Sequence, residues 1–353
     1  MTNHVEEIKN KLDIVDIVSS YINLQQASGN FRANCPFHNE KTASFTIMPN
    51  EQGYYCFGCQ KGGSMFSFIQ EMENLSFPEA VELLAEKAGV EIPKHEETGE
   101  DKRRSALIEL YSRVAGSFSH ILAEKESADE ARRYLEGRGI GGKLIQDFQL
   151  GYSPSDRYWL FKFLRKRNYS KDFLRESGLF SQRYPEVCLF SDRIMFPIRN
   201  NRGETVAFGG RIVGKDGPKY INSPDTPIFS KSRNLYGLHI SLPVIRKSRK
   251  FIIAEGYLDV IAFHKAGVDA CIAPLGTAFT DGQMNILKRY ATEGLLVFDG
   301  DEAGVRAAER GLAVCERAGV ECSVIEVQQG SDPADIVEKE GPEALKNLLK
   351  YPI

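Results

Sequence analysis

The sequence predicts a mixed α/β protein with three parts in chain order: a small N-terminal module, a basic α+β segment and a parallel α/β sheet. Three observations predict this fold class. Cysteine and histidine pairs at metal-ligand spacing lie within residues 35–59. Residues 153–250 carry a net charge of +12. After residue 250, short apolar strands alternate with helical stretches, which is typical of βαβ units.

Length and composition indicate a folded protein with more than one domain. The chain has 353 residues, of which 42% are hydrophobic and 26% are charged. That length allows two or three domains, and that composition excludes wholesale disorder. The sequence contains no apolar run long enough for a membrane span and no secretory signal at its start. We therefore expect a cytoplasmic protein whose seven cysteines stay reduced.

The charge is distributed unevenly along the chain. The net charge is -5 over residues 1–94, -2 over 95–152, +12 over 153–250 and -8 over 251–353. A concentrated basic segment attracts a polyanion, and nucleic acid is the common one. A well-solvated basic face is the alternative interpretation, and charge alone does not separate the two. The acidic C-terminal segment suggests metal binding.

Hydrophobic periodicity and turn residues locate the elements before residue 250. Helical spacing predicts helices at 5–24, 64–89, 106–124 and 128–136, whereas short strands are expected at 31–59 and 187–213, the latter including VCLF at 187–190. The polar stretch at 94–105 is expected to be a linker and a domain boundary.

Two short motifs in the N-terminal module have the spacing of metal ligands. Cys35-Pro-Phe-His38 is followed by Cys56-Phe-Gly-Cys59. Each tight turn can present two ligands to one tetrahedral ion, and three thiolates with one imidazole close its coordination shell. The spacing therefore predicts one structural zinc, in preference to chance cysteines in a loop.

Residues beside these motifs have two possible roles, in nucleic-acid binding or in the core around the zinc. Lys41, Phe45, Tyr55 and Phe57 could contact single-stranded bases, or the aromatic rings could form the small core around the zinc. We expect Phe57 to belong to that core and leave the others open.

Carboxylates follow two of the apolar strands after residue 250. Glu255 follows the strand 251–254, and Asp299 and Asp301 follow the strand 294–298. The carboxyl ends of parallel strands meet at one edge of a sheet, so these side chains should converge. Asp332 and Asp335 follow the next strand and could reach the same edge.

This arrangement predicts a site for Mg²⁺ or Mn²⁺, because these ions prefer oxygen ligands and join carboxylates that otherwise repel one another. Such ions can support phosphoryl transfer. Asp299 and Asp301 could instead only cap the helix that begins near Glu302. Capping does not explain Glu255 at a second strand end.

The motifs together resemble those of one family. NCPFHNEKTASF and YYCFGCQKGG resemble the CHC2 zinc ribbon of bacterial DnaG-type DNA primases, and AEGYLDVIA with VFDGDEAG resembles the Toprim motifs. Between them, DRIMFPIRNNRGETVAFGGRI and PKYINSPDTPIFSKSRNLYGL resemble the family's basic RNA-polymerase segment. The resemblance runs from about residue 5 to about residue 340, in the family's order.

The resemblance implies a DNA-dependent RNA polymerase that makes short RNA primers on single-stranded DNA from ribonucleoside triphosphates. Glu255, Asp299 and Asp301 match the family's catalytic metal-binding acids. The positions of its basic groove, which would hold template and nucleotides, are matched by Arg193, Arg211, Lys219, Tyr220, Asn222 and Lys231. The implied domains are a zinc domain at 1–94, a linker at 95–105, a basic subdomain at 106–250, a Toprim subdomain at 251–340 and the start of a helical segment at 341–353.

Two features depart from the family pattern. The later acidic motif is commonly Asp-Pro-Asp, but here it is Asp332-Pro-Ala-Asp335. The family usually continues into a domain that binds the replicative helicase, whereas this sequence stops at Ile353. We therefore expect the helicase contact to be absent from this chain.

Three other functions compete with a primase. A recombination mediator pairs a zinc motif with a Toprim fold without catalysis, but leaves the basic middle segment unexplained. A topoisomerase would need DNA-gate domains for which the chain has no room. A non-catalytic zinc-ribbon protein would need neither Glu255 nor the Asp299/Asp301 pair.

Overall fold

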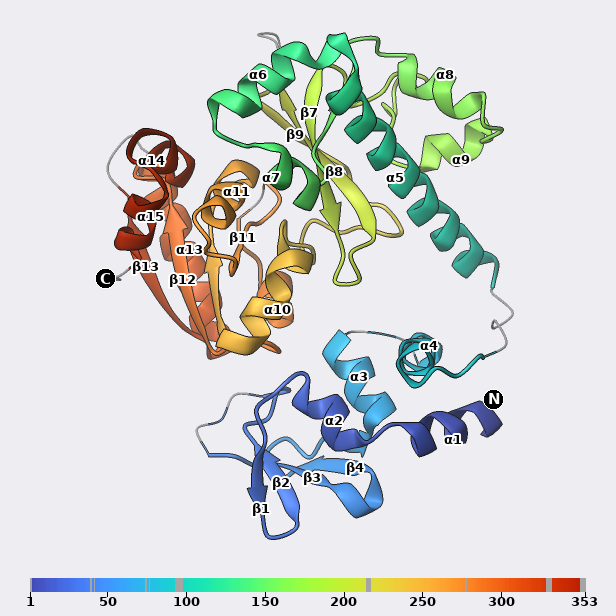
Figure 1. The fold of residues 1–353 in the computed structure, drawn as a ribbon, viewed down its shortest axis with the longest axis vertical. Helices are drawn as coiled ribbons and strands as arrows, with labels where there is room; N and C mark the ends of the chain where they lie inside the picture. The colour runs from blue at the N-terminus through green and yellow to red at the C-terminus, as the bar shows by residue number, and fades with distance from the viewer. Residues whose placement is uncertain are drawn as a thin grey trace. The chain divides into compact units, whose positions relative to one another are not determined.

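The computed structural model describes residues 2–38, 40, 42–73, 75, 77–92, 98–213, 217–276, 278–327 and 332–349 (Figure 1). The chain forms two compact units. Unit 1 comprises residues 1–98 with the short segments 246–249 and 285–292, and unit 2 comprises the remaining residues. The predicted parts 106–250 and 251–340 thus share most of one unit.

Unit 1 begins with two short helices followed by an antiparallel sheet. The helices are α1 (Thr2–Lys11) and α2 (Ile14–Ser19), separated where Asp13 caps α2 by accepting a hydrogen bond from the backbone N–H of Val15. The strands follow in the sheet order β1-β2-β3-β4-β5, each antiparallel to the next. Their bounds are β1 (Gln25–Ala27), β2 (Asn30–Ala33), β3 (Phe45–Met48), β4 (Gly53–Cys56) and β5 (Gly62–Ser64).

The sheet is followed by two helices, α3 (Met65–Glu73) and α4 (Phe77–Ala88), and aromatic rings join the sheet to α3. The rings of Phe45 and Tyr54 stack with centroids 5.0 Å apart, and both contact Phe68 of α3. This aromatic cluster joins the aliphatic side chains of Ile47 and Ile69, which are also fully buried, in the apolar core of the module.

Unit 2 opens with the long helix α5 (Gly99–Glu124). The expected linker at 95–105 is therefore wrong from residue 99 onward. Residues 99–105 are polar because this end of the helix is exposed, and Glu100 and Asp101 suit the positive end of a helix dipole. Further along, α5 buries Leu110, Val114 and Phe118 and packs against strands β6 (Gly151–Ser153) and β8 (Thr205–Ile212).

The first sheet of unit 2 is antiparallel, in the order β6-β7-β8-β9. Its strands are β6 (Gly151–Ser153), β7 (Arg193–Arg199), β8 (Thr205–Ile212) and β9 (Tyr220–Asn222). The strand expected at 187–190 is absent from this described segment. Cys188 is buried, but its backbone N–H donates to the carbonyl of Arg157 in a loop. Loop contacts, and not a neighbouring strand of the sheet, therefore bind the backbone of this apolar segment.

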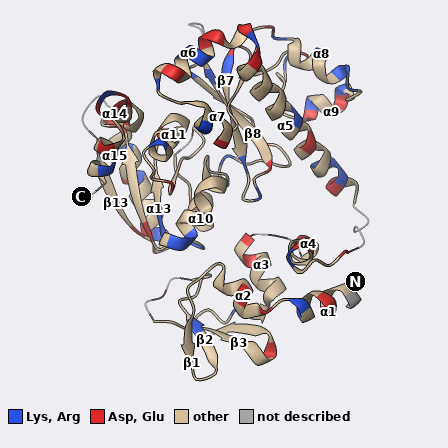
Figure 2. Ribbon diagram, viewed as in Figure 1, with Lys and Arg blue, Asp and Glu red and all other residues tan. Residues whose placement is uncertain are grey.

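Shorter helices surround this sheet. They are α6 (Asp129–Gly137), α7 (Gly142–Asp147), α8 (Trp159–Arg165) and α9 (Lys171–Glu176), whereas α10 (Leu238–Ser248) follows the sheet and bonds through Ser241 to His264 and Cys271 of the next part. Single-turn helices η1 (Pro49–Glu51) and η2 (Glu126–Ala128) lie in the connections. Lys and Arg gather on α8 and in the turn that follows it (Figure 2). Part of the basic excess of the middle segment is therefore found there.

The second sheet of unit 2 is parallel, in the order β11-β10-β12-β13. Its strands are β10 (Lys250–Ile253), β11 (Cys271–Ile272), β12 (Glu293–Phe298) and β13 (Glu321–Glu326). They read as continuous apolar runs because both faces are covered. Ile252 and Val297 join the core with α11, whereas Leu296 and Phe298 lie against Gly311 on the opposite side.

The helices of this part connect or follow the parallel strands. They are α11 (Tyr257–Lys265), α12 (Asp281–Leu287), α13 (Glu302–Ala318), α14 (Pro333–Glu340) and α15 (Pro342–Leu348). Strand–helix alternation thus confirms the predicted parallel sheet. No helix within the described ranges is long and apolar enough to span a membrane.

Candidate functional site: a Cys/His cluster and a carboxylate edge

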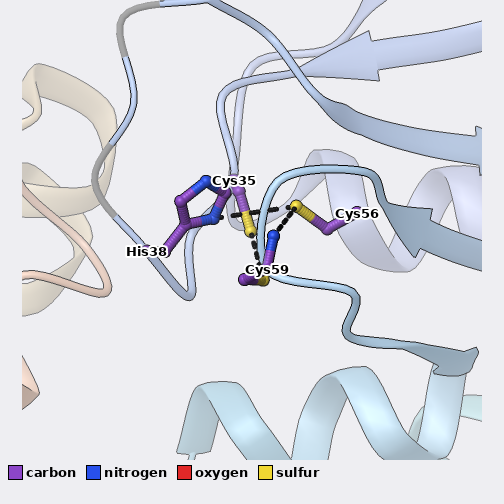
Figure 3. Close-up of side chains that lie close together, drawn as sticks. All are labelled: Cys35, His38, Cys56 and Cys59. Atoms are coloured by element: carbon purple, nitrogen blue, oxygen red, sulfur yellow. Dashed lines mark hydrogen bonds between the residues drawn. The ribbon is translucent and has the colours of Figure 1, made fainter.

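The four predicted zinc ligands come together in unit 1. Cys35 and His38 follow β2, Cys56 ends β4, and Cys59 lies in the turn before β5. Their ligand atoms all lie within 4.8 Å of one another, and Figure 3 shows them converging on one point. Cys35 Sγ is 3.8 Å from Cys59 Sγ, and Cys56 Sγ is 3.7 Å from His38 Nδ1.

These separations fit a tetrahedral zinc ion. Zinc–sulfur bonds of about 2.3 Å at the tetrahedral angle place two sulfur atoms about 3.8 Å apart. The backbone N–H groups of Phe37 and Cys59 donate to Cys35 Sγ and Cys56 Sγ, both at 3.4 Å, and so stabilise thiolates. Burial raises the pKa of both thiols. At Cys56 the hydrogen bonds from Cys59 and Ser44 outweigh burial and lower the pKa, whereas at Cys35 burial dominates and the pKa is raised, an effect that a bound cation would reverse. Four protein ligands leave no open position for substrate.

A carboxylate that the motif analysis missed supports the cluster. Glu40 Oε2 lies 3.3 Å from His38 Nε2, so Nε2–H can donate to it and leave Nδ1 free to bind metal. Glu40 Oε1 accepts hydrogen bonds from the backbone N–H groups of Cys35 and Ser44 at 2.7 and 3.0 Å. The signal in the sequence is a carboxylate two residues after a ligating histidine.

The aromatic residues of this module divide into buried and exposed groups. Phe45 is fully buried. Phe57 is 69% exposed and meets the half-exposed Tyr55 edge to face, with ring centroids 5.1 Å apart. The expectation that Phe57 belongs to the zinc core is therefore wrong, since the turn between Cys56 and Cys59 directs it outward. Lys41 lies outside the described residues.

The predicted carboxylates lie at neighbouring strand ends in unit 2. Glu255 follows β10 and Asp299 follows β12, and these two strands are paired. Glu255 Oε1 accepts a hydrogen bond of 2.9 Å from the backbone N–H of Asp299. A Cβ added to Gly304 would lie 2.0 Å from the carbonyl oxygen of Asp299 and 2.9 Å from Glu255 Oε1, so the approach of α13 requires glycine there.

Asp299 is the electrostatic centre of this edge. Its Oδ1 atom is buried and has no hydrogen-bond partner in the described part of the chain. Burial, together with Glu255, Asp332 and Asp301, raises the pKa of Asp299 to about 7, while Lys219 opposes the rise. Burial and the charges of Asp301 and Asp332 also raise the pKa of Glu255.

The remaining acids have additional backbone roles. Asp301 caps α13 by accepting from the N–H of Gly304 at 2.8 Å, and Asp332 caps α14 by accepting from the N–H of Asp335 at 2.6 Å. Asp335 itself pairs with Arg138 at 3.0 Å and with Lys339 at 3.5 Å. Asp301 thus does cap the helix, as the alternative interpretation expected. In Asp301 and in Asp332 the cap uses one carboxylate oxygen, and the other oxygen could bind a cation.

A buried acid, Asp259, was missed by the pattern of strand ends because it lies inside α11. It accepts hydrogen bonds from the backbone N–H groups of Gly256 and Ala334 at 3.0 and 3.4 Å. Burial, and then the charges of Asp332 and Asp299, raise its pKa well above the usual range. Asp259 therefore joins the loop after β10 to the start of α14. The signal in the sequence is an acid in the helix turn after Glu255.

An orphaned buried oxygen and raised carboxyl pKa values are what a cation would relieve, so these acids fit Mg²⁺ or Mn²⁺. Their spacing is looser than that of the zinc cluster. Among the described residues, the Cys35/His38/Cys56/Cys59 group alone has all its ligand atoms within 4.8 Å of one another. The magnesium assignment, including Asp332 and Asp335, stays a prediction.

The predicted groove residues differ in exposure. Lys219 is exposed, and its positive charge lowers the pKa of Asp299. Lys231 is half-buried. Arg211 lies with its guanidinium carbon 4.5 Å from the ring centroid of Tyr134 and 5.5 Å from that of Tyr220. One Nη atom of Arg211 donates to the Tyr220 hydroxyl at 3.3 Å and its Nε atom is buried, so phosphate binding by the other Nη atom stays a prediction.

Arg193 and Asn222 use their side chains within the fold. Arg193 is 3% exposed and donates to the carbonyls of Gly210 and Pro218 at 3.1 and 3.0 Å. Asn222 donates to the carbonyl of Leu275 at 2.8 Å and accepts from the Tyr257 hydroxyl at 2.5 Å. Both residues position the segment that carries Lys219, and their direct contact with nucleic acid stays a prediction.

Comparison with known proteins agrees with the motif order. Residues 1–100 match the family described as CHC2 zinc finger, residues 118–241 match the N-terminal domain of the DNA primase catalytic core, and residues 252–337 match a Toprim-like family. A crystal structure of the Aquifex aeolicus primase, with zinc-binding and RNA polymerase domains, is similar over 99% of this chain and 85% of its own, at 34% identity and a TM-score of 0.65. This chain belongs to the DnaG-type DNA primase family.

Curated DnaG-type primases are longer than this chain. The DNA primase of Treponema pallidum is 38% identical over 350 residues, which is 98% of this chain and 58% of that protein. The Pseudomonas putida primase is 39% identical over 96% of this chain and 53% of its own length. The chain therefore spans somewhat more than half the length of these relatives. As in the CHC2 family, Cys35, His38, Cys56 and Cys59 form a zinc site.

Proposed function

We propose that this chain is the RNA-synthesising part of a primase, joining ribonucleoside triphosphates into short primers along single-stranded DNA. One observation carries the proposal: the buried, unpartnered Oδ1 of Asp299 lies at a strand-end cluster of acids beside an exposed lysine. Solved relatives support it. A DnaG primase catalytic domain bound to single-stranded DNA is 32% identical and similar over 71% of this chain, with a TM-score of 0.65.

The proposed division of labour follows the parts predicted from the sequence. The zinc domain at 1–94 contributes template contacts, the basic subdomain at 106–250 holds strand and nucleotides, and the Toprim subdomain at 251–340 holds the catalytic cation. The Mycobacterium tuberculosis polymerase domain, solved with double-stranded DNA, is 32% identical over 70% of this chain. A primer–template duplex is therefore a second nucleic-acid form that this core could hold.

Glu255, Asp299 and Asp301 would hold Mg²⁺ or Mn²⁺, with Asp332 next to them. When bound, the cation would neutralise charge on the triphosphate and lower the pKa of the primer 3′-hydroxyl. Lys219 would bind a phosphate group near Asp299, and Arg211, held between Tyr134 and Tyr220, would bind another. These residues orient the α-phosphate for attack, which is most of what an enzyme contributes to phosphoryl transfer.

Primer synthesis on a single-stranded template tests the proposal. The protein, loaded with zinc, is given single-stranded DNA, labelled ribonucleoside triphosphates and Mg²⁺, and short RNA is resolved on a gel. Asp299→Asn should lower the rate by a factor of about 10² or more while DNA binding stays near normal. Asp281→Asn is the matched control, because this exposed acid pairs with Arg317 on the surface.

Two results would contradict the proposal. Synthesis at the normal rate by Asp299→Asn would contradict both the metal site and the polymerase assignment. DNA binding without synthesis by the unaltered chain would favour the alternative of a non-catalytic recombination mediator.

A further inference from the structure

An ion-pair cluster joins the end of α6 to the first turn of α14 within unit 2. Asp335 Oδ1 lies 3.0 Å from Arg138 Nη1, although 197 positions separate the two residues in the chain. Glu338, one turn later on α14, lies 3.3 Å from the same nitrogen. The side chains of Arg138 and Asp335 are only 24% and 26% exposed, so solvent screens this pair less than an ordinary surface pair.

Arg138 is itself held in place by the surrounding elements. It caps the C-terminus of α6, and its carbonyl accepts a hydrogen bond of 3.3 Å from Lys265 Nζ of α11. Its guanidinium carbon lies 5.8 Å from the ring centroid of Tyr134, whose ring also contacts Arg211. Burial lowers the pKa of Arg138, but Tyr134 and then the acids at the start of α14 outweigh burial and raise it. Arg138 is therefore a permanent positive charge at a fixed position.

Asp335 and Asp332 use their carboxylates in different ways. Both oxygens of Asp335 face protein cations, since Oδ1 pairs with Arg138 and Oδ2 lies 3.5 Å from Lys339 Nζ. Asp332 uses one oxygen for its helix cap, which leaves the other for a cation. The charge of Asp332 also reaches the carboxylate edge, because burial and then Asp332 raise the pKa of Asp259. Asp332 thus suits a cation ligand, whereas Asp335 suits an anchor.

The backbone of α14 links this anchor to the carboxylate edge. The N–H of Asp335 donates to Asp332 Oδ1 at 2.6 Å, and the N–H of Ala334 donates to Asp259 Oδ1 at 3.4 Å. The residue that pairs with Arg138 through its side chain therefore holds Asp332 through its backbone. A shift of this turn would move Asp332 relative to Asp299. Partners of this kind orient the ligands of a metal site and tune its affinity.

We propose that Asp335 is a positioning residue: its ion pair with Arg138 fixes the first turn of α14 and so holds Asp332 beside the catalytic cation, which Asp335 does not itself bind. This inference rests on the cation site of the proposed function. Without the carboxylate of Asp335, the first turn of α14 loses its link to α6. The charge of Arg138, which already acts on Asp332, would then compete with the cation for that carboxylate.

Binding of Mn²⁺ tests this role without any need for primer synthesis. The full chain, loaded with zinc and free of nucleotide, is titrated with Mn²⁺, and free Mn²⁺ is measured by electron paramagnetic resonance. Asp335→Asn keeps the size of the side chain and the backbone donor, and should weaken Mn²⁺ binding about fivefold, the upper end for loss of a partly exposed ion pair. Glu340→Gln is the matched control, because it removes the same charge from the exposed end of α14 and should change little.

A charge swap separates an anchor from a ligand. Asp335→Arg alone should weaken Mn²⁺ binding, and adding Arg138→Asp should restore it, because the swapped pair attracts as the original pair does. A lost ligand would not be restored in this way. Circular dichroism checks that each variant is folded, and Asp335→Asn provides the same comparison if a reversed charge prevents folding.

Three results would overturn the proposal: unchanged Mn²⁺ binding in Asp335→Asn, equal weakening by Glu340→Gln, or no restoration by the swap. Asp335→Asn with unchanged Mn²⁺ binding and a lower KM for triphosphate would show instead that Asp335 restrains Arg138 from a nucleotide phosphate. Unchanged Mn²⁺ binding in Asp299→Asn would remove the cation site itself, and with it the proposed function. Weakened binding in Asp299→Asn without restoration by the swap contradicts the positioning role alone.

Discussion

Replacing Asp299 by asparagine should stabilise the magnesium-free protein while removing its activity. The unfavourable environment of Asp299 is the reason. Burial, then Glu255, Asp332 and Asp301, raise its pKa from 3.8 to about 7, so the folded state resists ionising this carboxyl group. Asparagine has the same size and no charge to destabilise.

The size and the pH range of the effect follow from that shift. Each pKa unit corresponds to about 1.4 kcal/mol, so the full shift corresponds to about 4 kcal/mol. The side chain is partly exposed, and halving the value for solvent screening leaves about 2 kcal/mol. The unfolded chain releases this proton near pH 3.8 and the folded chain near pH 7. The free energy of unfolding therefore falls as pH rises between these values, and stays lowered above them.

Thermal unfolding at a series of pH values measures this directly. Asp299→Asn and the unaltered chain should differ little near about pH 4, and the variant should melt about 4–8 °C higher near about pH 8. Adding Mg²⁺ at about ten times its Kd should stabilise the unaltered chain by about 1.4 kcal/mol and the variant far less. A melting difference that does not change with pH, or equal stabilisation of both by Mg²⁺, would refute the reasoning.

Four further substitutions test other parts of the fold. Cys59→Ser should lower the zinc content, measured by atomic absorption, and unfold the zinc module locally; unchanged zinc content would contradict the ligand assignment. Glu40→Gln should keep the fold and weaken the affinity for zinc about 10–100-fold, measured by competition with a chelator. Lys219→Ala should flatten the slope of log K against log salt for single-stranded DNA by about 0.7, and an unchanged slope with a raised triphosphate KM would instead assign it to the nucleotide. Burial, then Arg199, lowers the pKa of His239 from 6.5 to about 4, so stability should fall as pH drops through that range and His239→Gln should remove that part of the fall in a urea titration.

The parallel sheet and the zinc cluster could be predicted because their sequence signals are local and strong. The strands after residue 250 are buried on both faces, so each reads as a short apolar run before a helix. The ligand pairs around Cys35 and Cys56 each lie within one turn, so spacing alone brings them together.

Other features depend on contacts that spacing does not encode. The start of α5 reads as a linker because its first turns bury nothing, and residues 187–190 read as a strand although loops bury them. Strands β6 and β9 have three residues each, too few to show a period. Arg193 and Lys219 both read as positively charged residues in the sequence, and only the fold shows that Arg193 is buried and Lys219 is exposed.

The side chain of Asn222 has a kinetic consequence for the proposed reaction. It joins strand β9 both to Tyr257 of α11 and to the carbonyl of Leu275 after β11, so the segment carrying Lys219 is held to the same framework as the acids. The translational and rotational freedom of these reacting groups is thus lost during folding and not at each turnover. An entering triphosphate has only its own motion to give up, which leaves more of its binding free energy to lower the barrier.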